Sequence, residues 1–358
     1  MRRLLVALVS TTALAGAFPA SAAAGDVAVD IGTDSYSGPY AGVRYRADSG
    51  ERNRLSIAFD GSTVRVTDAA GIRPGENCSA TPGDSKRALC TLGDTNRGVS
   101  LRVELRDRSD RVAVRGRRRL DDQLGSTIRG GSGDDRIDVR AAGALPRSGH
   151  DGAYLYGNGG DDVLIGGPLR DFFDGGRRPN GSDTFIGGGS NDDWVTYRSR
   201  KGNVRADLRG DRDDGARGER DRIGRDIEQI SGGNGNDRLV GNSRRNLIVG
   251  EGGRDTLIGR GGGDTLDSGD DIPDRGDRLF GGRGNDKLRG GDGPDVIDAG
   301  PGRDRVLAWK GRDRIDLRDR SADEVSCGPG VDLVRMDRLD VFDHLSQRDC
   351  ERVRRQRR

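Results

Sequence analysis

Acidic side chains recur at a fixed spacing between Gly232 and Asp267. This stretch is four consecutive nine-residue units, GGNGNDRLV, GNSRRNLIV, GEGGRDTLI and GRGGGDTLD. Each unit has glycine in its first half, a carboxylate or carboxamide at its sixth place and an aliphatic residue at its eighth. Glycine tolerates positive φ, and it lets backbone carbonyls converge without a Cβ in the way. The pattern therefore brings side-chain and backbone oxygen atoms into the same turns.

The same spacing predicts the elements that carry these side chains. Six residues dense in Gly and Asp form neither a helix nor an ordinary strand, whereas three residues around a central Leu, Ile or Val form a short strand whose middle side chain points inward. Turns and strands in alternation give a right-handed solenoid with two units per coil and glycine turns stacked along two edges. We therefore expect an all-β protein, built as a parallel β-roll of glycine-rich nonapeptide repeats.

The pattern resembles the RTX, or haemolysin-type calcium-binding, nonapeptide family, whose signature is G-G-x-G-x-D-x-U-x. The resemblance implies that Ca²⁺ lies between stacked turns, held by sixth-position carboxylates and turn carbonyls, because calcium prefers hard oxygen ligands. The aspartates that it assigns as metal ligands are Asp135, Asp162, Asp171, Asp183, Asp237, Asp255, Asp264, Asp277, Asp286, Asp295, Asp304 and Asp313.

Two ladders of side chains follow if two units make one coil. The first is Asp237, Asp255, Asp277, Asp295 and Asp313, and the second is Asn246, Asp264, Asp286, Asp304 and Asp323. The alternative is a solenoid in which aspartates only cap turns. Two features weaken the calcium interpretation: Asn246 lacks a charge, and the arginines that flank Asp304 and Asp313 are able to pair with the carboxylates and compete with an ion.

The repeat occupies residues 125–335, with an insertion at 196–231. Residues 25–124 lack it and show alternating segments such as LSIAF (55–59) and VSLRVEL (99–105), which predict a small N-terminal β module. Residues 336–358 are expected to form a disulfide-pinned capping segment with a basic tail.

The first 24 residues are typical of a secretory signal peptide. A basic start precedes an apolar run from Leu4 to Phe18 and an Ala-Ser-Ala box at 20–22. A retained anchor helix is the alternative, and no other segment is apolar enough to cross a membrane. The four cysteines form two local pairs, Cys78 with Cys90 and Cys327 with Cys350. In an exported protein such pairs indicate two disulfides, with a zinc site as the alternative. We therefore expect a secreted, extracellular protein.

Charge is dense but balanced, with 61 basic and 59 acidic residues and a net charge of +2. The sequence shows no unbroken basic stripe, which argues against nucleic acid as the main partner. The terminal RVRRQRR either contacts anionic cell-envelope or extracellular polymers or is a solvated tail.

Residues that indicate catalysis are hard to find. His150 and His344 lie far apart, and neither a G-x-S-x-G elbow nor a phosphate-binding loop occurs. Adjacent acids such as Asp161 and Asp162 are expected by chance in a chain so rich in Asp. We therefore expect no enzyme, but a secreted calcium-binding protein whose repeats bind calcium and thereby fold or stiffen the solenoid outside the cell. The alternatives are a calcium-independent structural or adhesive solenoid and a polysaccharide-modifying β-helix enzyme.

Overall fold

The computed structural model describes residues 24–34, 38–92, 99–116, 126–142, 152–177, 181–269, 275–342, 350 and 352–355. This part of the chain contains strands and no helix, so it holds no apolar helix of membrane-spanning length. Apart from Ala24, the predicted signal peptide lies outside the described residues, as do both histidines.

Long strands form the N-terminal part, and most repeat strands have three residues, as the repeat predicts. Strands β1 to β9 are Gly25–Asp34, Gly38–Arg46, Arg54–Asp60, Thr63–Thr67, Ile72–Pro74, Cys78–Thr81, Asp84–Thr91, Val99–Glu104 and Arg111–Gly116. Strands β10 to β20 are Thr127–Ser132, Arg136–Ala142, Tyr154–Gly159, Val163–Ile165, Phe172–Asp174, Thr184–Ile186, Trp194–Thr196, Val204–Asp207, Gly215–Ala216, Arg222–Ile223 and Gln229–Ser231. Strands β21 to β33 are Arg238–Val240, Leu247–Val249, Thr256–Gly261, Thr265–Asp267, Arg278–Arg283, Lys287–Arg289, Val296–Asp298, Arg305–Leu307, Arg314–Asp316, Glu324–Ser326, Leu333–Met336, Val341–Phe342 and Arg352–Arg355.

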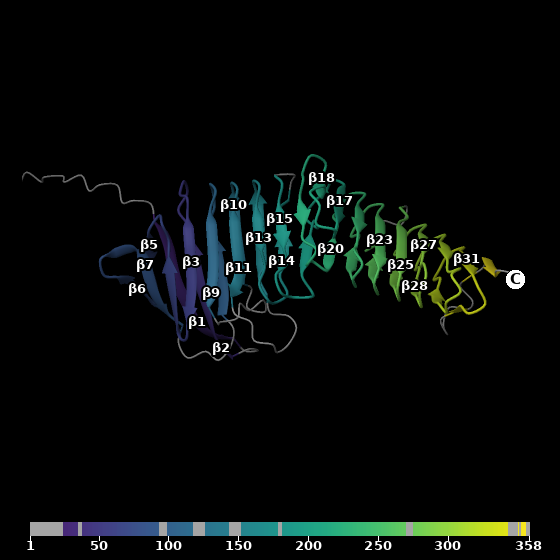
Figure 1. The fold of residues 1–358 in the computed structure, drawn as a ribbon, viewed down its shortest axis with the longest axis horizontal. Helices are drawn as coiled ribbons and strands as arrows, with labels where there is room; N and C mark the ends of the chain where they lie inside the picture. The colour runs from purple at the N-terminus through teal and green to yellow at the C-terminus, as the bar shows by residue number, and fades with distance from the viewer. Residues whose placement is uncertain are drawn as a thin grey trace, which may run out of the picture.

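Each repeat strand pairs in parallel with the strand of the next coil, two repeat units later along the chain. Strands β22, β24, β26 and β28 pair in series within a 15-stranded sheet, while β21, β23, β25 and β27 pair in series within a nine-stranded sheet. A second nine-stranded sheet contains the corresponding strands of the earlier coils. Figure 1 shows the result as an elongated stack of coils. The predicted all-β solenoid with two units per coil is confirmed.

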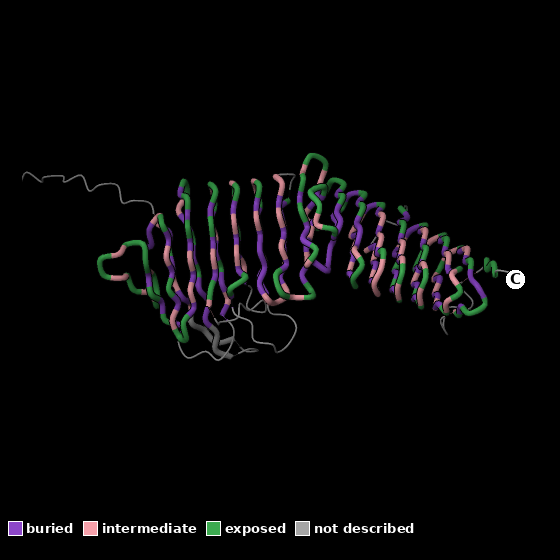
Figure 2. The backbone as a smooth tube through the Cα atoms, viewed as in Figure 1, coloured by how far each residue is buried: buried purple, intermediate pink, exposed green. Residues whose placement is uncertain are grey.

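One aliphatic side chain from each strand fills the interior of the stack. Leu239, Leu257 and Leu279 lie in register on three adjacent strands, and each is fully buried. Burial of such a side chain contributes roughly 1.5–3 kcal/mol. The buried cluster runs without interruption from Val27 to Met336, and Figure 2 shows buried residues alternating with exposed ones along each coil. The core is therefore long and thin.

The N-terminal strands share sheets with the repeat strands. Strand β8 pairs in parallel with both β2 and β10, and β9 pairs in parallel with both β3 and β11. Antiparallel pairing is confined in this region to β1 with β2 and to the series β3, β4, β7 and β6. The same sheets therefore hold strands from both sides of the predicted boundary, and the domain boundaries drawn from the repeat pattern stay predictions.

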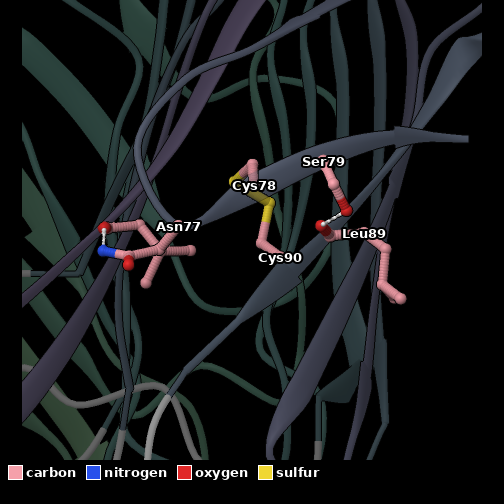
Figure 3. Close-up of a disulfide and its surroundings, with 6 residues drawn as sticks. Asn77, Cys78, Ser79, Leu89 and Cys90 are labelled. Carbon is pink, nitrogen blue, oxygen red and sulfur yellow. Dashed lines mark hydrogen bonds between the residues drawn. A yellow bond between two sulfur atoms is a disulfide. The ribbon is translucent and has the colours of Figure 1, made fainter.

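Both predicted disulfides are present. Cys78 and Cys90 lie directly opposite each other on β6 and β7 (Figure 3). The adjoining Asn77 side chain donates a hydrogen bond to the Val29 carbonyl at 2.8 Å, which fastens this hairpin to β1. Cys327 and Cys350 join the chain end to the last coils. Beyond that bridge, Arg352–Arg355 forms β33 and pairs with β31, so this part of the basic tail adds a final rung to the solenoid.

The insertion at 196–231 is held together by buried polar side chains. The Tyr197 hydroxyl donates to Asp221 Oδ2 at 2.9 Å, and the Arg200 guanidinium pairs with Glu219 at 3.0 Å. Strand β19 of the insertion ends one nine-stranded sheet by pairing with β15, and β17 continues into the other by pairing with β21. On one face of the solenoid, the first nine-stranded sheet therefore ends within the insertion and the second one begins there.

Candidate metal centres

The sixth-position aspartates stack in a ladder along one edge of the solenoid. The backbone N–H of Asp237 donates to Asp255 Oδ1 at 2.7 Å, and the N–H of Asp255 donates to Asp277 Oδ1 at 2.5 Å. The same bond recurs from Asp277 to Asp295, from Asp295 to Asp313 and from Asp313 to Asp332, at 2.7, 2.8 and 2.8 Å. The stacking expected for this edge is confirmed.

The opposite edge carries a second ladder of the same kind. The N–H of Asn246 donates to Asp264 Oδ1 at 2.8 Å, and the N–H of Asp264 donates to Asp286 Oδ1 at 2.7 Å. Equivalent bonds join Asp286 to Asp304 at 2.7 Å and Asp304 to Asp323 at 2.8 Å. Each coil therefore places one carboxylate or carboxamide at each edge, and the predicted second ladder is confirmed as an arrangement.

Both ladders extend toward the N-terminus. Asp135 accepts the N–H of Asp110, Asp162 accepts that of Asp135, and Asp183 accepts that of Asp162, at 2.8, 2.8 and 3.0 Å. Asp183 N–H in turn donates to Asp221 Oδ1 at 2.8 Å. On the other edge, Asp171 Oδ1 accepts the N–H of Ala153, and Asp171 N–H donates to Asp193 Oδ1, both at 2.8 Å.

Three of these ladder residues, Asp110, Asp193 and Asp221, are absent from the predicted ligands. Asp110 stands at the sixth place of LRDRSDRVA, with Val112 at the eighth, so part of the signal is present. The glycines of this turn are replaced by Arg106 and Arg108, which adopt φ of 77° and 68°. Residues other than glycine rarely adopt such a positive φ. A search for glycine-rich turns therefore does not find this turn.

The second carboxylate oxygen of a ladder aspartate lies against the first glycine of its own unit. A Cβ on Gly259 would stand 2.4 Å from Asp264 Oδ2 and 2.4 Å from the carbonyl oxygen of Gly281 in the next coil. The same holds for Gly281, where a Cβ would lie 2.7 Å from Asp286 Oδ2. A Cβ at either position would therefore require the turn to shift, as it can do in the units of Asp304 and Asp313, which begin with Ala299 and Ala308. The two glycines leave a carboxylate oxygen and a carbonyl oxygen facing the same small space.

Burial makes these carboxylates hard to ionise in the calcium-free protein. Desolvation raises the pKa of Asp264 to about 7 and those of Asp162 and Asp304 to about 8. The Oδ2 atoms of Asp264, Asp286 and Asp304 are buried and accept no hydrogen bond within the described chain. A buried charge needs a partner. A cation with oxygen ligands supplies one, so these residues fit calcium.

Two predicted ligands have less capacity for an ion. Asp237 Oδ2 accepts the N–H of Gly233, and Asp171 Oδ2 accepts the N–H of Gly167, each at 2.6 Å. Both oxygens of these two carboxylates are already used by the backbone, so at these positions the capping interpretation describes the contacts.

Carboxylates alone do not complete a ligand shell in either ladder. Within the described residues, the one group that brings three carboxylates within 4.8 Å of one another is Asp207, Asp213 and Asp214. Arg209 binds Asp207 at 2.6 Å, and the N–H groups of Asp207 and Ile223 bind Asp214, so two of these three carboxylates already have partners in the protein. Calcium in the ladders would rely on backbone carbonyls for most ligands.

The expected competition from flanking arginines is wrong for the described residues. Arg303 and Arg312 are exposed and form no ion pair within 4.0 Å with Asp304 or Asp313, whose side chains are buried. Both arginines lie in the turns before β28 and β29, where they face solvent while the aspartate next to each is buried.

The comparison with known families agrees with this geometry. Residues 126–141, 149–177, 230–272 and 274–316 match the RTX calcium-binding nonapeptide repeat as four copies. Of the twelve predicted ligands, only Asp183 falls outside these segments. A search of curated proteins gave no match. These four segments therefore belong to the RTX calcium-binding nonapeptide repeat family, whose repeats bind Ca²⁺.

Proposed function

We propose that the protein is secreted, and that calcium bound along the two aspartate ladders folds and stiffens the solenoid outside the cell. The observation that carries the proposal is the row of buried Oδ2 atoms at Asp264, Asp286 and Asp304, which have no hydrogen-bond donor in the described chain. Those of Asp264 and Asp286 also lie close to a carbonyl oxygen of the next coil.

The ligands proposed are the twelve repeat aspartates, with carbonyls of the stacked turns completing each shell. Oδ1 of each aspartate fixes the turn of the preceding coil, and Oδ2 faces the space between coils. Sites at Asp135, Asp162, Asp183 and along 255–313 offer this arrangement best. Asp171 and Asp237 would first have to release a backbone N–H.

In this proposal, calcium affects folding because the coils bury acidic groups at both edges of the solenoid. Without a cation these groups must be protonated or remain buried as uncompensated charges, and both cost free energy at neutral pH. Binding free energy then becomes folding free energy. Extracellular calcium modules bind at roughly 10⁻⁴ to 10⁻³ M, so the chain would stay loose where calcium is scarce and become ordered after export.

The cysteines support the extracellular part of the proposal. All four are paired in the two disulfides. Disulfides persist in oxidising compartments outside the cytosol. Together with the signal peptide expected at residues 1–24, they favour secretion. Cleavage after Ala22 or Ala24, read by mass spectrometry of the exported protein, is the expected result, and an uncleaved chain would contradict it.

A calcium titration tests the folding role. The titration is made at a pH of about 8, where the buried carboxylates lose their protons. The calcium-free protein should then lack much of its β-sheet circular dichroism, and added calcium should restore it. Asp286→Asn combined with Asp304→Asn should shift the transition to higher calcium concentration, because two buried ligands lose their charge. Asp292→Asn is the matched control, since Asp292 is paired with Lys310 at 2.8 Å on the surface. A fully ordered spectrum in EGTA would contradict the folding role.

A calcium-independent structural or adhesive solenoid is the second candidate. The bond from each ladder N–H to the next Oδ1 favours it, because these bonds form without an ion. Resistance of the fold to EGTA would select this candidate. For either function we propose a binding or structural role without catalysis.

A further inference from the structure

Arginines from distant parts of the chain meet in one groove of about 560 Å³. Its lining includes Arg209, Arg225, Arg244, Arg260 and Arg283, together with Asn242 and Ser243, while Asp211 is the one acidic residue among the described residues that line it. All five arginines are exposed. The groove lies where the insertion meets the second aspartate edge, so it combines residues that are dispersed in the sequence.

Backbone stacking sets these arginines on successive rungs. The Asn242 side chain donates to the Leu208 carbonyl at 3.3 Å, and the Gly261 N–H donates to the Asn242 carbonyl at 3.3 Å. Gly261 is in turn paired with Arg283 in the register of β23 and β25. Four rungs about 4.8 Å apart span about 14 Å, so the groove presents a row of cations along the solenoid axis.

Much of this positive charge is not neutralised by the protein. Arg260 and Arg283 have no carboxylate within 4.0 Å among the described residues, and Arg225 uses its Nε to donate to the Arg209 carbonyl. Arg209 pairs with Asp207 at 2.6 Å, and Arg244 contacts Glu228 at 3.4 Å. The guanidinium groups of Arg260 and Arg283 therefore keep their full capacity for an anion.

Arg260 is also held in a backbone conformation that suits glycine. Its φ is 75°, and the equivalent positions of the next two coils on this edge are Gly282 and Gly300, with φ of 98° and 87°. A side chain in the left-handed region is strained relative to glycine. The chain thus keeps a long cationic side chain at the position where folding alone favours glycine.

We infer that this groove binds a linear acidic polysaccharide, whose carboxylate or sulfate groups contact successive arginine rungs. The planar guanidinium matches such groups with two parallel hydrogen bonds, and Asn242 and Ser243 are suited to sugar hydroxyls. Among the described residues no aromatic side chain lines the groove, so these residues offer no platform for stacking nucleic-acid bases. Its extension over four rungs favours an extended ligand over a single small anion.

Binding is measured on the full chain in saturating calcium, using oligogalacturonate and a heparin oligosaccharide as probes. Neutral dextran, polyphosphate and single-stranded DNA serve as comparison ligands, and each probe is first titrated with calcium alone because acidic sugars bind calcium themselves. At least one acidic sugar should bind in a salt-dependent manner and more tightly than the three comparison ligands. Equal binding of dextran would overturn the inference, and tighter binding of polyphosphate or DNA would overturn the assignment to a polysaccharide.

Arg260→Gly is the decisive variant, because it removes the cation and relieves the backbone. It should weaken acidic-sugar binding by about tenfold while leaving the melting temperature unchanged or higher. Arg106→Gly is the matched control: it is an arginine with φ of 77° in a turn on the other edge, so affinity should stay unchanged. Arg260→Gly should still fold on addition of calcium, because it retains every ladder carboxylate, which separates this test from that of the calcium function. An unchanged sugar affinity in Arg260→Gly would overturn the inference.

Discussion

The two oxygens of each ladder carboxylate have different surroundings. In Asp264, Oδ1 accepts the N–H of Asn246 at 2.8 Å, whereas Oδ2 lies against Gly259 without a donor in the described chain. Turn capping and cation binding, which compete as interpretations of the sequence, therefore use different atoms of one side chain. The first glycine of the unit has its own function, since its missing Cβ makes room for Oδ2.

That requirement predicts the effect of adding one methyl group. Gly259→Ala places a Cβ 2.4 Å from both Asp264 Oδ2 and the Gly281 carbonyl, so the turn must shift. We expect the free energy of unfolding in saturating calcium to fall by about 1–3 kcal/mol, measured by chemical denaturation. Gly202→Ala is the control, because a Cβ there meets nothing within 4 Å, and its effect should stay within about 0.5 kcal/mol. Equal effects of the two substitutions would contradict the close-approach argument.

At the scale of the coil, the sequence predicts the turns and strands that carry the repeat signature. It does not predict the turns that depart from that signature. The spacing of Asp237, Asp255 and Asp264 predicts both ladders. Two repeat units make one coil of the solenoid, so the aspartates of alternate units stack along the same edge. The turn at Asp110 escapes prediction because arginines replace its glycines. The arginine groove escapes because Arg244, Arg260 and Arg283 become neighbours only when coils stack.

The ladders also predict how stability depends on pH without calcium. Burial raises the pKa of Asp162 and Asp304 to about 8 and that of Asp264 to about 7, above the ordinary value of 3.8. The folded state then holds protons that the unfolded chain releases. Stability of the calcium-free protein is therefore greatest below a pH of about 4 and falls as the pH rises toward about 8.

Thermal melting of calcium-free protein between about pH 5 and about pH 8 checks this sign. The melting temperature should fall over that interval, and saturating calcium should reduce or reverse the fall, because calcium binds the ionised carboxylates. Asp304→Asn should make the calcium-free dependence shallower. A melting temperature that rises with pH in the absence of calcium would contradict the buried-acid argument.

At the scale of the whole molecule, stability is distributed along one dimension. Each coil contacts its neighbours through one or two buried aliphatic residues, and the ends have a neighbour on one side only. The N-terminal end is covered by antiparallel strands, and the C-terminal end depends on the bridge between Cys327 and Cys350.

Removal of that bridge should therefore loosen the C-terminal end first. In Cys327→Ser with Cys350→Ser, hydrogen exchange is expected to accelerate in β33 and β31 while strands near Leu257 keep their protection. The loss of a disulfide costs about 2–4 kcal/mol of stability where it closes a loop of this kind. Cys78→Ser with Cys90→Ser is the comparison, because it should affect the other end. Uniform acceleration along the chain would contradict this one-dimensional behaviour.

The last rung, β33, has a consequence for contacts between molecules. A terminal strand exposes unpaired N–H and C=O groups that a second chain is able to extend into a fibre. Here that strand is Arg352–Arg355, in which three of the four residues are arginines and all four are exposed. Two such ends repel each other. We therefore expect this basic strand to disfavour the pairing of two such ends at the edge of this nine-stranded sheet.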